Sequence, residues 1–120
     1  MAYDQSDVEA LLPLPTAAFH ILLALSAGDC HGYGIIQDVD ARTNGALRLG
    51  PGTLYRTIQR LLEEGLIEEL RKPAGLKNDP RRRYYRITRF GTAVVRADAR
   101  RITELARLAR GVLRVAPESS

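Results

Sequence analysis

The sequence predicts a mainly α-helical fold with a small β-sheet, followed by one long C-terminal helix. Three observations lead to this prediction. Apolar residues recur at helical spacing through most of the chain. Two short runs of β-branched and aromatic residues flank a segment with two prolines and one glycine, which is typical of a β-hairpin. The length of 120 residues suits one domain with its own core.

The first half of the chain predicts two core helices. Residues 1–13 suggest at most a short helix, which is either a mobile arm or a segment that packs on a partner subunit. Residues 15–27 are apolar nearly all round, so they form the central core helix. A second helix extends from residue 32 to about 43, because Asn44 and Gly45 favour a turn.

Residues 50–66 (GPGTLYRTIQRLLEEGL) predict a helix of about four turns. Pro51 suits its first turn, where a missing N–H is harmless, and Gly65 suits the left-handed position after its end. Its apolar residues form one stripe that must be buried: Leu54, Ile58, Leu61 and Leu62. The opposite face carries Thr, Arg and Gln, which are side chains that hydrogen-bond base edges or phosphates.

The polar face of this helix supplies the candidate DNA contacts: Thr53, Tyr55, Arg56, Gln59 and Arg60. The N-terminal half also has the positive end of the helix dipole, whereas Glu63 and Glu64 at the other end would be repelled by phosphates. The alternative is an ordinary amphipathic helix with a solvated polar face. Tyr55, at the flank of the apolar stripe, either reaches a phosphate or has a structural role.

Residues 66–71 and 83–88 predict a hairpin, and residues 47–49 a very short additional strand. Positive charge concentrates there: residues 71–89 hold eight basic residues and one acidic residue, although the net charge of the chain is only +4. The basic side chains expected to contact phosphates are Lys72, Lys77, Arg81, Arg82 and Arg83. For Arg83, a role within the sheet is the alternative.

This order of helices and strands is that of a winged helix-turn-helix, whose third helix enters a major groove and whose hairpin wing follows the DNA backbone or an adjacent minor groove. Four segments follow from it. Residues 1–13 are the arm, residues 14–88 the DNA-binding domain, residues 89–115 a dimerisation helix and residues 116–120 a disordered tail.

The last helix carries a broad apolar stripe after Thr88, which can cap its start. Five of six heptad seam positions are apolar, and they predict the dimer interface: Val95, Ile102, Leu105, Ala109 and Val112. The sixth is Asp98, which could pair with Arg101 of the partner subunit. A helix folded back over its own domain is the alternative.

Other function classes find little support in the composition. The single cysteine, Cys30, excludes an internal disulfide and fits a reducing cytoplasm, and no segment is long and apolar enough for a membrane span. With two histidines and no glycine-rich phosphate loop, we expect no enzyme, no cofactor and no metal site. A metal- or redox-sensing repressor that uses Cys30 with His31 or His20 stays an alternative.

Four motifs resemble those of PadR-type transcriptional regulators, in the family's order and spacing. They are HGYGI at residues 31–35, LGPGTLYRTIQRL at 49–61, EEGLIE at 63–68 and RRRYYRIT at 81–88. The resemblance covers residues 14–113 and matches a short form with a single C-terminal dimerisation helix. It implies that residues 51–64 are the recognition helix, that residues 72–82 are the wing, and that Tyr55 lies near the DNA backbone.

The resemblance also implies a homodimeric repressor that binds a double-stranded, pseudo-palindromic operator and releases it on sensing a small molecule. The effector of this chain does not follow from it. The sequence has no tryptophan, so a pocket built on stacked indoles does not exist here. A winged helix that contacts another protein, with its basic wing on an acidic partner, is the remaining alternative.

Overall fold

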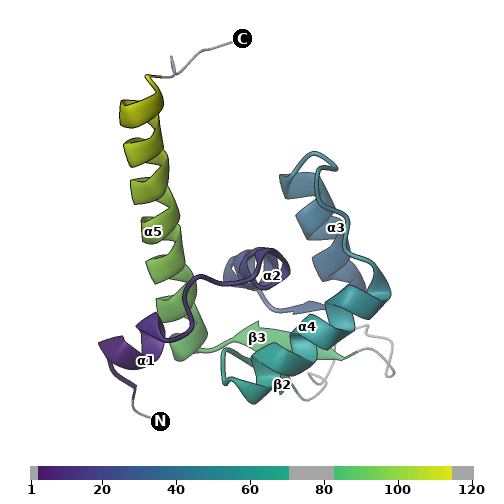
Figure 1. The fold of residues 1–120 in the computed structure, drawn as a ribbon. Helices are drawn as coiled ribbons and strands as arrows, with labels where there is room; N and C mark the ends of the chain where they lie inside the picture. Colours follow the sequence, from purple (N-terminus) through teal and green to yellow (C-terminus); the bar gives the residue numbers. More distant parts are fainter. Residues whose placement is uncertain (1–2, 71–82, 115–120) are drawn as a thin grey trace.

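The structure is a computed structural model that describes residues 3–70 and 83–114. Its elements are α1 (Gln5–Glu9), α2 (Thr16–Ala27), β1 (Cys30–His31), α3 (Gly32–Arg42), α4 (Pro51–Glu63), β2 (Ile67–Leu70), β3 (Tyr84–Ile87) and α5 (Arg89–Leu113). Figure 1 shows α2 at the centre, with the sheet, α3 and α4 on one side and α5 on the other. The predicted fold class is therefore confirmed.

Helix α2 organises the core. It packs against α3, α4, α5 and β3, and Ile21, Leu22 and Leu25 on it are fully buried. A helix that is apolar on all sides has to be covered from several directions. This requirement places α3 and α4 on one side of α2, and α5 on another side. Helix α2 therefore joins the part that contains α3 and α4 to the long helix α5.

The sheet has three antiparallel strands in the order β1-β3-β2. Strands β2 and β3 form the predicted hairpin, with Ile67 opposite Ile87 and Leu70 opposite Tyr84. The third strand is Cys30–His31, which pairs with Tyr85 and Tyr84. The prediction of a strand at residues 47–49 is wrong.

Residues 47–49 lie in the connection between α3 and α4 and outside the described sheet. Leu49 is buried and Leu47 half-buried, with an exposed residue between them, so the burial alternates as it does in a strand. The N–H of Leu47, however, donates to the hydroxyl of Thr43 (3.0 Å). Alternating burial indicates that the chain is extended over a core. A β-strand also needs a neighbouring strand to pair with, and the burial pattern says nothing about that.

Helix α5 begins at the predicted cap. The Thr88 hydroxyl accepts a hydrogen bond from the N–H of Gly91 (2.9 Å). The first half of α5 packs on α1 and α2 and buries Val94, Val95 and Asp98. The second half extends beyond the other elements (Figure 1), and its large apolar residues are exposed.

The structure contradicts one prediction for α5. Val95 is predicted to lie in a dimer interface, but it is 4% exposed in a single chain and belongs to the chain's own core. Within the chain, the carboxylate of Asp98 pairs with Arg101 (Oδ1 to Nε, 2.7 Å). The heptad pattern does not distinguish these cases, because residues of the core and of an interface share one helix face.

Helix α1 packs on α5 of the same chain. Val8 is buried, and the rings of Tyr3 and Phe90 lie 5.0 Å apart. Asp4 and Asp7 form a capping box, in which each carboxylate accepts the backbone N–H of the other residue. These contacts fix α1 beside the start of α5.

Candidate nucleic-acid interface

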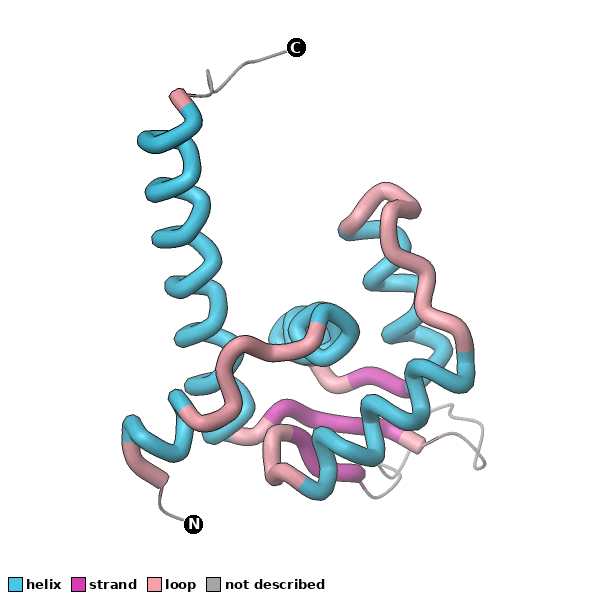
Figure 2. The backbone as a smooth tube through the Cα atoms, viewed as in Figure 1, coloured by secondary structure: helices cyan, strands magenta, loops and turns pink. Residues whose placement is uncertain are grey.

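Helices α3 and α4 are joined by residues 43–50, which Figure 2 shows as a long bend above the sheet. Asn44 and Gly45 both have left-handed backbone angles (φ 51° and 79°). The N–H of Gly45 donates to the carbonyl of Asp40 (2.8 Å), and the Asp40 carboxylate lies 3.3 Å from Nε of Arg48. The turn that the Asn-Gly pair predicts thus sets the direction in which the chain leaves α3 towards α4.

The two faces of α4 differ as the sequence predicts. Leu54, Ile58 and Leu61 are buried in the core, where α4 packs against α2. The candidate DNA contacts on this helix are all exposed: Thr53, Tyr55, Arg56, Gln59 and Arg60. A helix can read base edges only with side chains that point away from its own core, and these side chains do so.

Side chains in the C-terminal half of α4 pair with one another. Nε of Arg60 lies 3.3 Å from Oε2 of Glu64, and Nε2 of Gln59 donates to Oε2 of Glu63 at 3.4 Å. Both are i, i+4 pairs, a spacing that brings side chains together on a helix surface. The sequence predictions did not include them, although the spacing signals them. The Arg60–Glu64 pair partly neutralises the charge at this end of the helix.

The N-terminal half of α4 has a different charge environment. Nη2 of Arg56 lies 3.4 Å from the hydroxyl of Thr53, and within residues 3–70 and 83–114 no acidic side chain forms an ion pair with Arg56. Gly50 is the N-cap and Pro51 the first helical residue, as predicted. Positive potential from the helix dipole and from Arg56 therefore coincides at this end.

Tyr55 has a structural contact as well as an exposed surface. It is 52% exposed, but its hydroxyl lies so close to Gly32 that a Cβ at position 32 would be 2.5 Å from it. Gly32 is the first residue of α3, so the close approach of Tyr55 explains a glycine where helix propensity disfavours one. Tyr55 thus packs α4 onto the start of α3.

The predicted wing lies mostly outside the described residues, which include Arg83 but not Lys72, Lys77, Arg81 or Arg82. Arg83 is exposed, and its Nε is 3.9 Å from Oε2 of Glu69 on β2. This contact favours the alternative role of Arg83 in the sheet. Further along β3, Arg86 makes a bidentate pair with Asp29 (Nη2–Oδ2 2.9 Å, Nε–Oδ1 3.3 Å), which raises the pKa of Arg86.

Cys30 and His31 lie directly before the start of α3. Nδ1 of His31 accepts the N–H of Gly34 (3.0 Å) and so caps the helix. Burial raises the pKa of the Cys30 thiol; a hydrogen bond with the His31 backbone lowers it by less, and the charge of Asp38 has the smallest effect, which again raises it. In the part of the chain that the structure describes, no three His, Cys, Asp or Glu residues are grouped to hold a metal ion.

The same described part contains no helix with the length and apolar character that a membrane span requires. Arg48 is a further exposed basic side chain, close in sequence to the start of α4, which the sequence predictions left without a role. It is 80% exposed and precedes α4 by three residues.

Comparison with protein families identifies the class of this molecule. The model of the transcriptional regulator PadR-like family matches residues 21–97. The chain belongs to the PadR-like family. Its members are transcriptional regulators and not enzymes, and the function of this chain is accordingly the regulation of transcription through DNA binding.

Two relatives share more than a third of their aligned residues with this PadR-like chain. The transcriptional regulator Rv3488 of Mycobacterium tuberculosis is 37% identical over 89 residues, or 73% of this chain and 77% of that protein. An uncharacterized protein of Lysinibacillus sphaericus is 36% identical over 73 residues. That match takes in 61% of this chain and 65% of the length of the relative.

Solved structures show the same winged-helix fold. A PadR family transcription regulator of Clostridium difficile has a TM-score of 0.71 and 22% identity, with 82% of this chain and 99% of that chain covered. Bacillus subtilis PadR, solved in complex with operator DNA, has a TM-score of 0.58 and 20% identity, with 69% of this chain and 46% of that chain covered.

Proposed function

We propose that this regulator reads specific DNA sequences by inserting α4 into the major groove. The observation that carries the proposal is the exposed polar face of α4, held in place by the burial of its apolar stripe. Thr53, Arg56 and Gln59 present donors and acceptors suited to base edges. Contact concentrates in the N-terminal half, where Arg56 and the helix dipole attract phosphates. The binding of operator DNA by Bacillus subtilis PadR supports this proposal.

The regulator acts as a homodimer joined by the outer half of α5. At about 100° per residue, Ile102, Leu105 and Val112 lie on the same face as the buried Val94 and Asp98. The exposed apolar residues of this half are Ile102, Leu105, Leu108, Val112 and Leu113. The small Ala109 lies among them and allows close approach. A second copy presents the same stripe, so twofold-symmetric packing of the two α5 helices would bury both stripes.

The twofold axis determines the kind of operator. Two copies of α4 can read half-sites about 34 Å apart, one DNA turn, so the operator is a pseudo-palindrome. Bound dimers block transcription, and a small-molecule effector releases them by favouring a dimer state that does not fit DNA. The required preference between states is a few kcal/mol. A regulator of this kind acts in the cytoplasm.

Selection from a random pool of DNA duplexes tests this function. We expect the purified chain to enrich a pseudo-palindrome with half-sites one turn apart, and its affinity for that duplex to fall steeply with salt. Enrichment of no sequence, with weak binding to all duplexes, would contradict base reading. It would favour the other role of a winged helix, contact with an acidic protein partner.

A further inference from the structure

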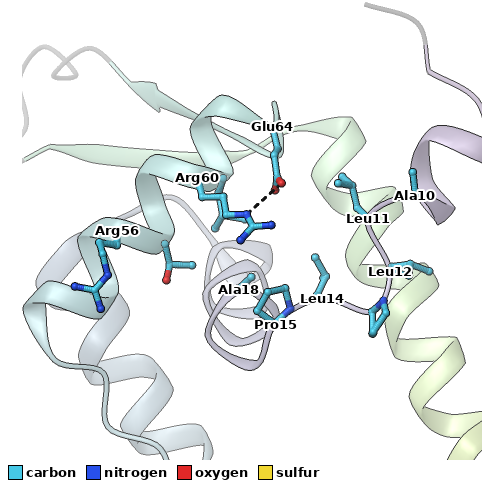
Figure 3. A pocket seen from close by; sticks show the side chains of 12 residues that line it. Ala10, Leu11, Leu12, Leu14, Pro15, Ala18, Arg56, Arg60 and Glu64 are labelled. Atoms are coloured by element: carbon cyan, nitrogen blue, oxygen red, sulfur yellow. Dashed lines mark hydrogen bonds and ion pairs between the residues drawn. The ribbon is translucent and has the colours of Figure 1, made fainter.

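The side chains of Arg60 and Glu64 on α4 form a pair of defined geometry. Nε of Arg60 donates to Oε2 of Glu64 at 3.3 Å, and Figure 3 shows the guanidinium turned towards this carboxylate. Both residues line a cavity between α4 and residues 10–15. The side chain of Glu64 is 27% exposed and that of Arg60 67% exposed, so the acid is the less accessible partner. Glu64 therefore restricts the directions in which Arg60 can point.

The contact with Glu64 uses one side of the guanidinium and leaves the other side for a further partner. A guanidinium has five N–H donors, of which Nε carries one and the two Nη atoms carry four. Glu64 accepts from Nε, and among the described residues nothing accepts a hydrogen bond from Nη1 or Nη2 of Arg60. Two neighbouring Nη groups match the O6 and N7 acceptors of guanine, the base that arginine most often reads in a major groove.

The neutral charge of this pair favours a base over a phosphate as that partner. Phosphates attract a cation through its charge and through the counterions that its binding releases. Glu64 cancels the charge of Arg60 and is itself repelled by phosphates, so the pair gains little from the DNA backbone. Hydrogen bonds to a base edge depend instead on direction and fit. Arg56 differs, because no acidic side chain pairs with it within the described residues.

We propose that Glu64 is a specificity-determining residue, which directs Arg60 to a guanine of the operator and prevents it from binding phosphates of any sequence. Glu64 does not contact DNA itself and acts as a positioning residue. This inference rests on the proposed insertion of α4 into the major groove. It adds one base contact from the C-terminal half of α4 to those of the N-terminal half.

The first experiment replaces Glu64 by its uncharged isostere. The affinity of the full-length chain is measured for the selected duplex and for random duplexes over a range of salt concentrations. Glu64→Gln should bind random DNA severalfold more tightly, with a salt dependence steeper by about one unit of slope per subunit, because Arg60 is then free to bind a phosphate. Affinity for the selected duplex should not rise. The ratio of selected to random affinity should therefore fall about fivefold or more.

Glu63→Gln is the matched control for this experiment. It removes the same charge from the same end of α4, but the partner of Glu63 is the neutral Gln59, at 3.4 Å. Its loss should tighten binding to both kinds of duplex alike and keep the affinity ratio within about twofold of the parent. If Glu64→Gln also keeps this ratio, Glu64 acts through its charge alone and the proposal is overturned.

The second experiment asks whether Glu64 acts through Arg60. In the Arg60→Gln background Glu64 has no guanidinium to direct, so adding Glu64→Gln should lower the affinity ratio no further. Arg60→Lys keeps the charge but lacks the paired Nη groups, so it should lower the ratio by itself. An equal effect of Glu64→Gln with and without Arg60 would contradict the proposal, because it would show that the two residues act independently.

The third experiment locates the base. 7-Deazaguanine lacks the N7 acceptor, and it replaces each guanine of the selected half-site in turn. At one position the affinity of the parent should fall severalfold, whereas the affinity of Arg60→Gln should not change at that position. If no guanine behaves in this way, Arg60 does not read a guanine and the proposal fails.

The outcomes separate this proposal from the proposed function. If no duplex is selected from the random pool, the DNA-reading role of α4 fails and the role of Glu64 fails with it. If a duplex is selected but Glu64→Gln keeps the parent affinity ratio, only the role of Glu64 fails. An exposed i, i+4 ion pair contributes little to stability, so circular dichroism should show the same helix content for the parent and all variants.

Discussion

The hydroxyl of Thr88 donates a hydrogen bond to the carbonyl oxygen of Gly65, 2.7 Å away, and accepts one from the N–H of Gly91. Gly65 is the left-handed residue (φ 77°) that follows α4, and Gly91 is in the first turn of α5. The N–H of Thr88 also donates to the carbonyl of Leu66 (3.0 Å). One residue therefore ties the end of α4 to the start of the proposed dimer helix.

Replacing Thr88 should destabilise the fold through both helix ends. Thr88→Ala removes the cap of α5 and leaves the carbonyl of Gly65 without its donor, so we expect a loss of about 1–2 kcal/mol in the free energy of unfolding. Thr88→Ser keeps the hydroxyl and should lose much less. Urea denaturation of the three proteins measures this, and equal losses for Ala and Ser would show that the methyl group, not the hydroxyl, matters.

Two glycines of α5 should respond oppositely to alanine. A Cβ at Gly91 would overlap the carbonyl oxygen of Leu66 and lie 2.8 Å from Cγ1 of Ile87, whereas no described atom lies within 4 Å of a Cβ at Gly111. We expect Gly91→Ala to destabilise the chain by about 3 kcal/mol, the upper end of overpacking effects. Gly111→Ala should be neutral or stabilising by up to about 1 kcal/mol. Thermal unfolding of both variants gives the comparison, and a stable Gly91→Ala protein would contradict the close packing of α5 on Leu66.

The sequence predicts features that depend on neighbouring residues better than features that depend on residues far along the chain. Helix ends depend on local signals, so Pro51, Gly65 and Thr88 located α4 and α5 to within a residue or two. Strand β1 depends on a partner strand that lies more than fifty residues further along the chain, because Cys30 faces Tyr85 in the sheet. A strand of two residues is too short to show an alternating pattern, so the sequence did not predict it.

The candidate site was predictable in its exposure and less so in its contacts. The amphipathic period of α4 separates buried Leu54 from exposed Arg56 without knowledge of the fold. Whether an apolar residue of α5 faces its own core or solvent depends instead on how far the domain extends along the helix. Val95 is inside that limit and Ile102 is beyond it. The cavity between α4 and residues 10–15 depends on how these residues pack over α4, for which the sequence gives no signal.

The thiol of Cys30 should react slowly at neutral pH. Its pKa is raised chiefly by burial, so less of the reactive thiolate is present at a given pH than in an ordinary cysteine. We expect iodoacetamide to alkylate the folded chain more slowly than the urea-unfolded chain at pH 8, and the pH profile of the folded chain to lie at higher pH. Because Cys30 is the single cysteine, mass spectrometry reads the reaction directly. A profile at lower pH would instead support a redox-sensing role.

A charge in the exposed stripe of α5 should dissociate the dimer. Leu105 is 52% exposed in the single chain and lies at the centre of the proposed interface, so Leu105→Glu would bury an unpaired charge there. Thr103→Glu, about 160° around the helix, is the matched control. We expect sedimentation velocity to show monomers for Leu105→Glu and dimers for the parent and control, with unchanged helix content. A dimeric Leu105→Glu protein would place the interface elsewhere.

Arg56 should contribute more to specificity than to general affinity. Its guanidinium is exposed in the N-terminal half of α4 and contacts the Thr53 hydroxyl at 3.4 Å, so it can donate two hydrogen bonds to a base edge. A base contact of this kind discriminates by about 1–3 kcal/mol, whereas a phosphate contact weakens all duplexes alike when it is lost. Arg56→Ala should therefore lower affinity for the selected duplex about tenfold to a hundredfold and affinity for random DNA only slightly. Arg110→Ala, an exposed arginine of α5, should change neither affinity. Equal losses on selected and random duplexes would assign Arg56 to the phosphate backbone and move base reading to Thr53 and Gln59.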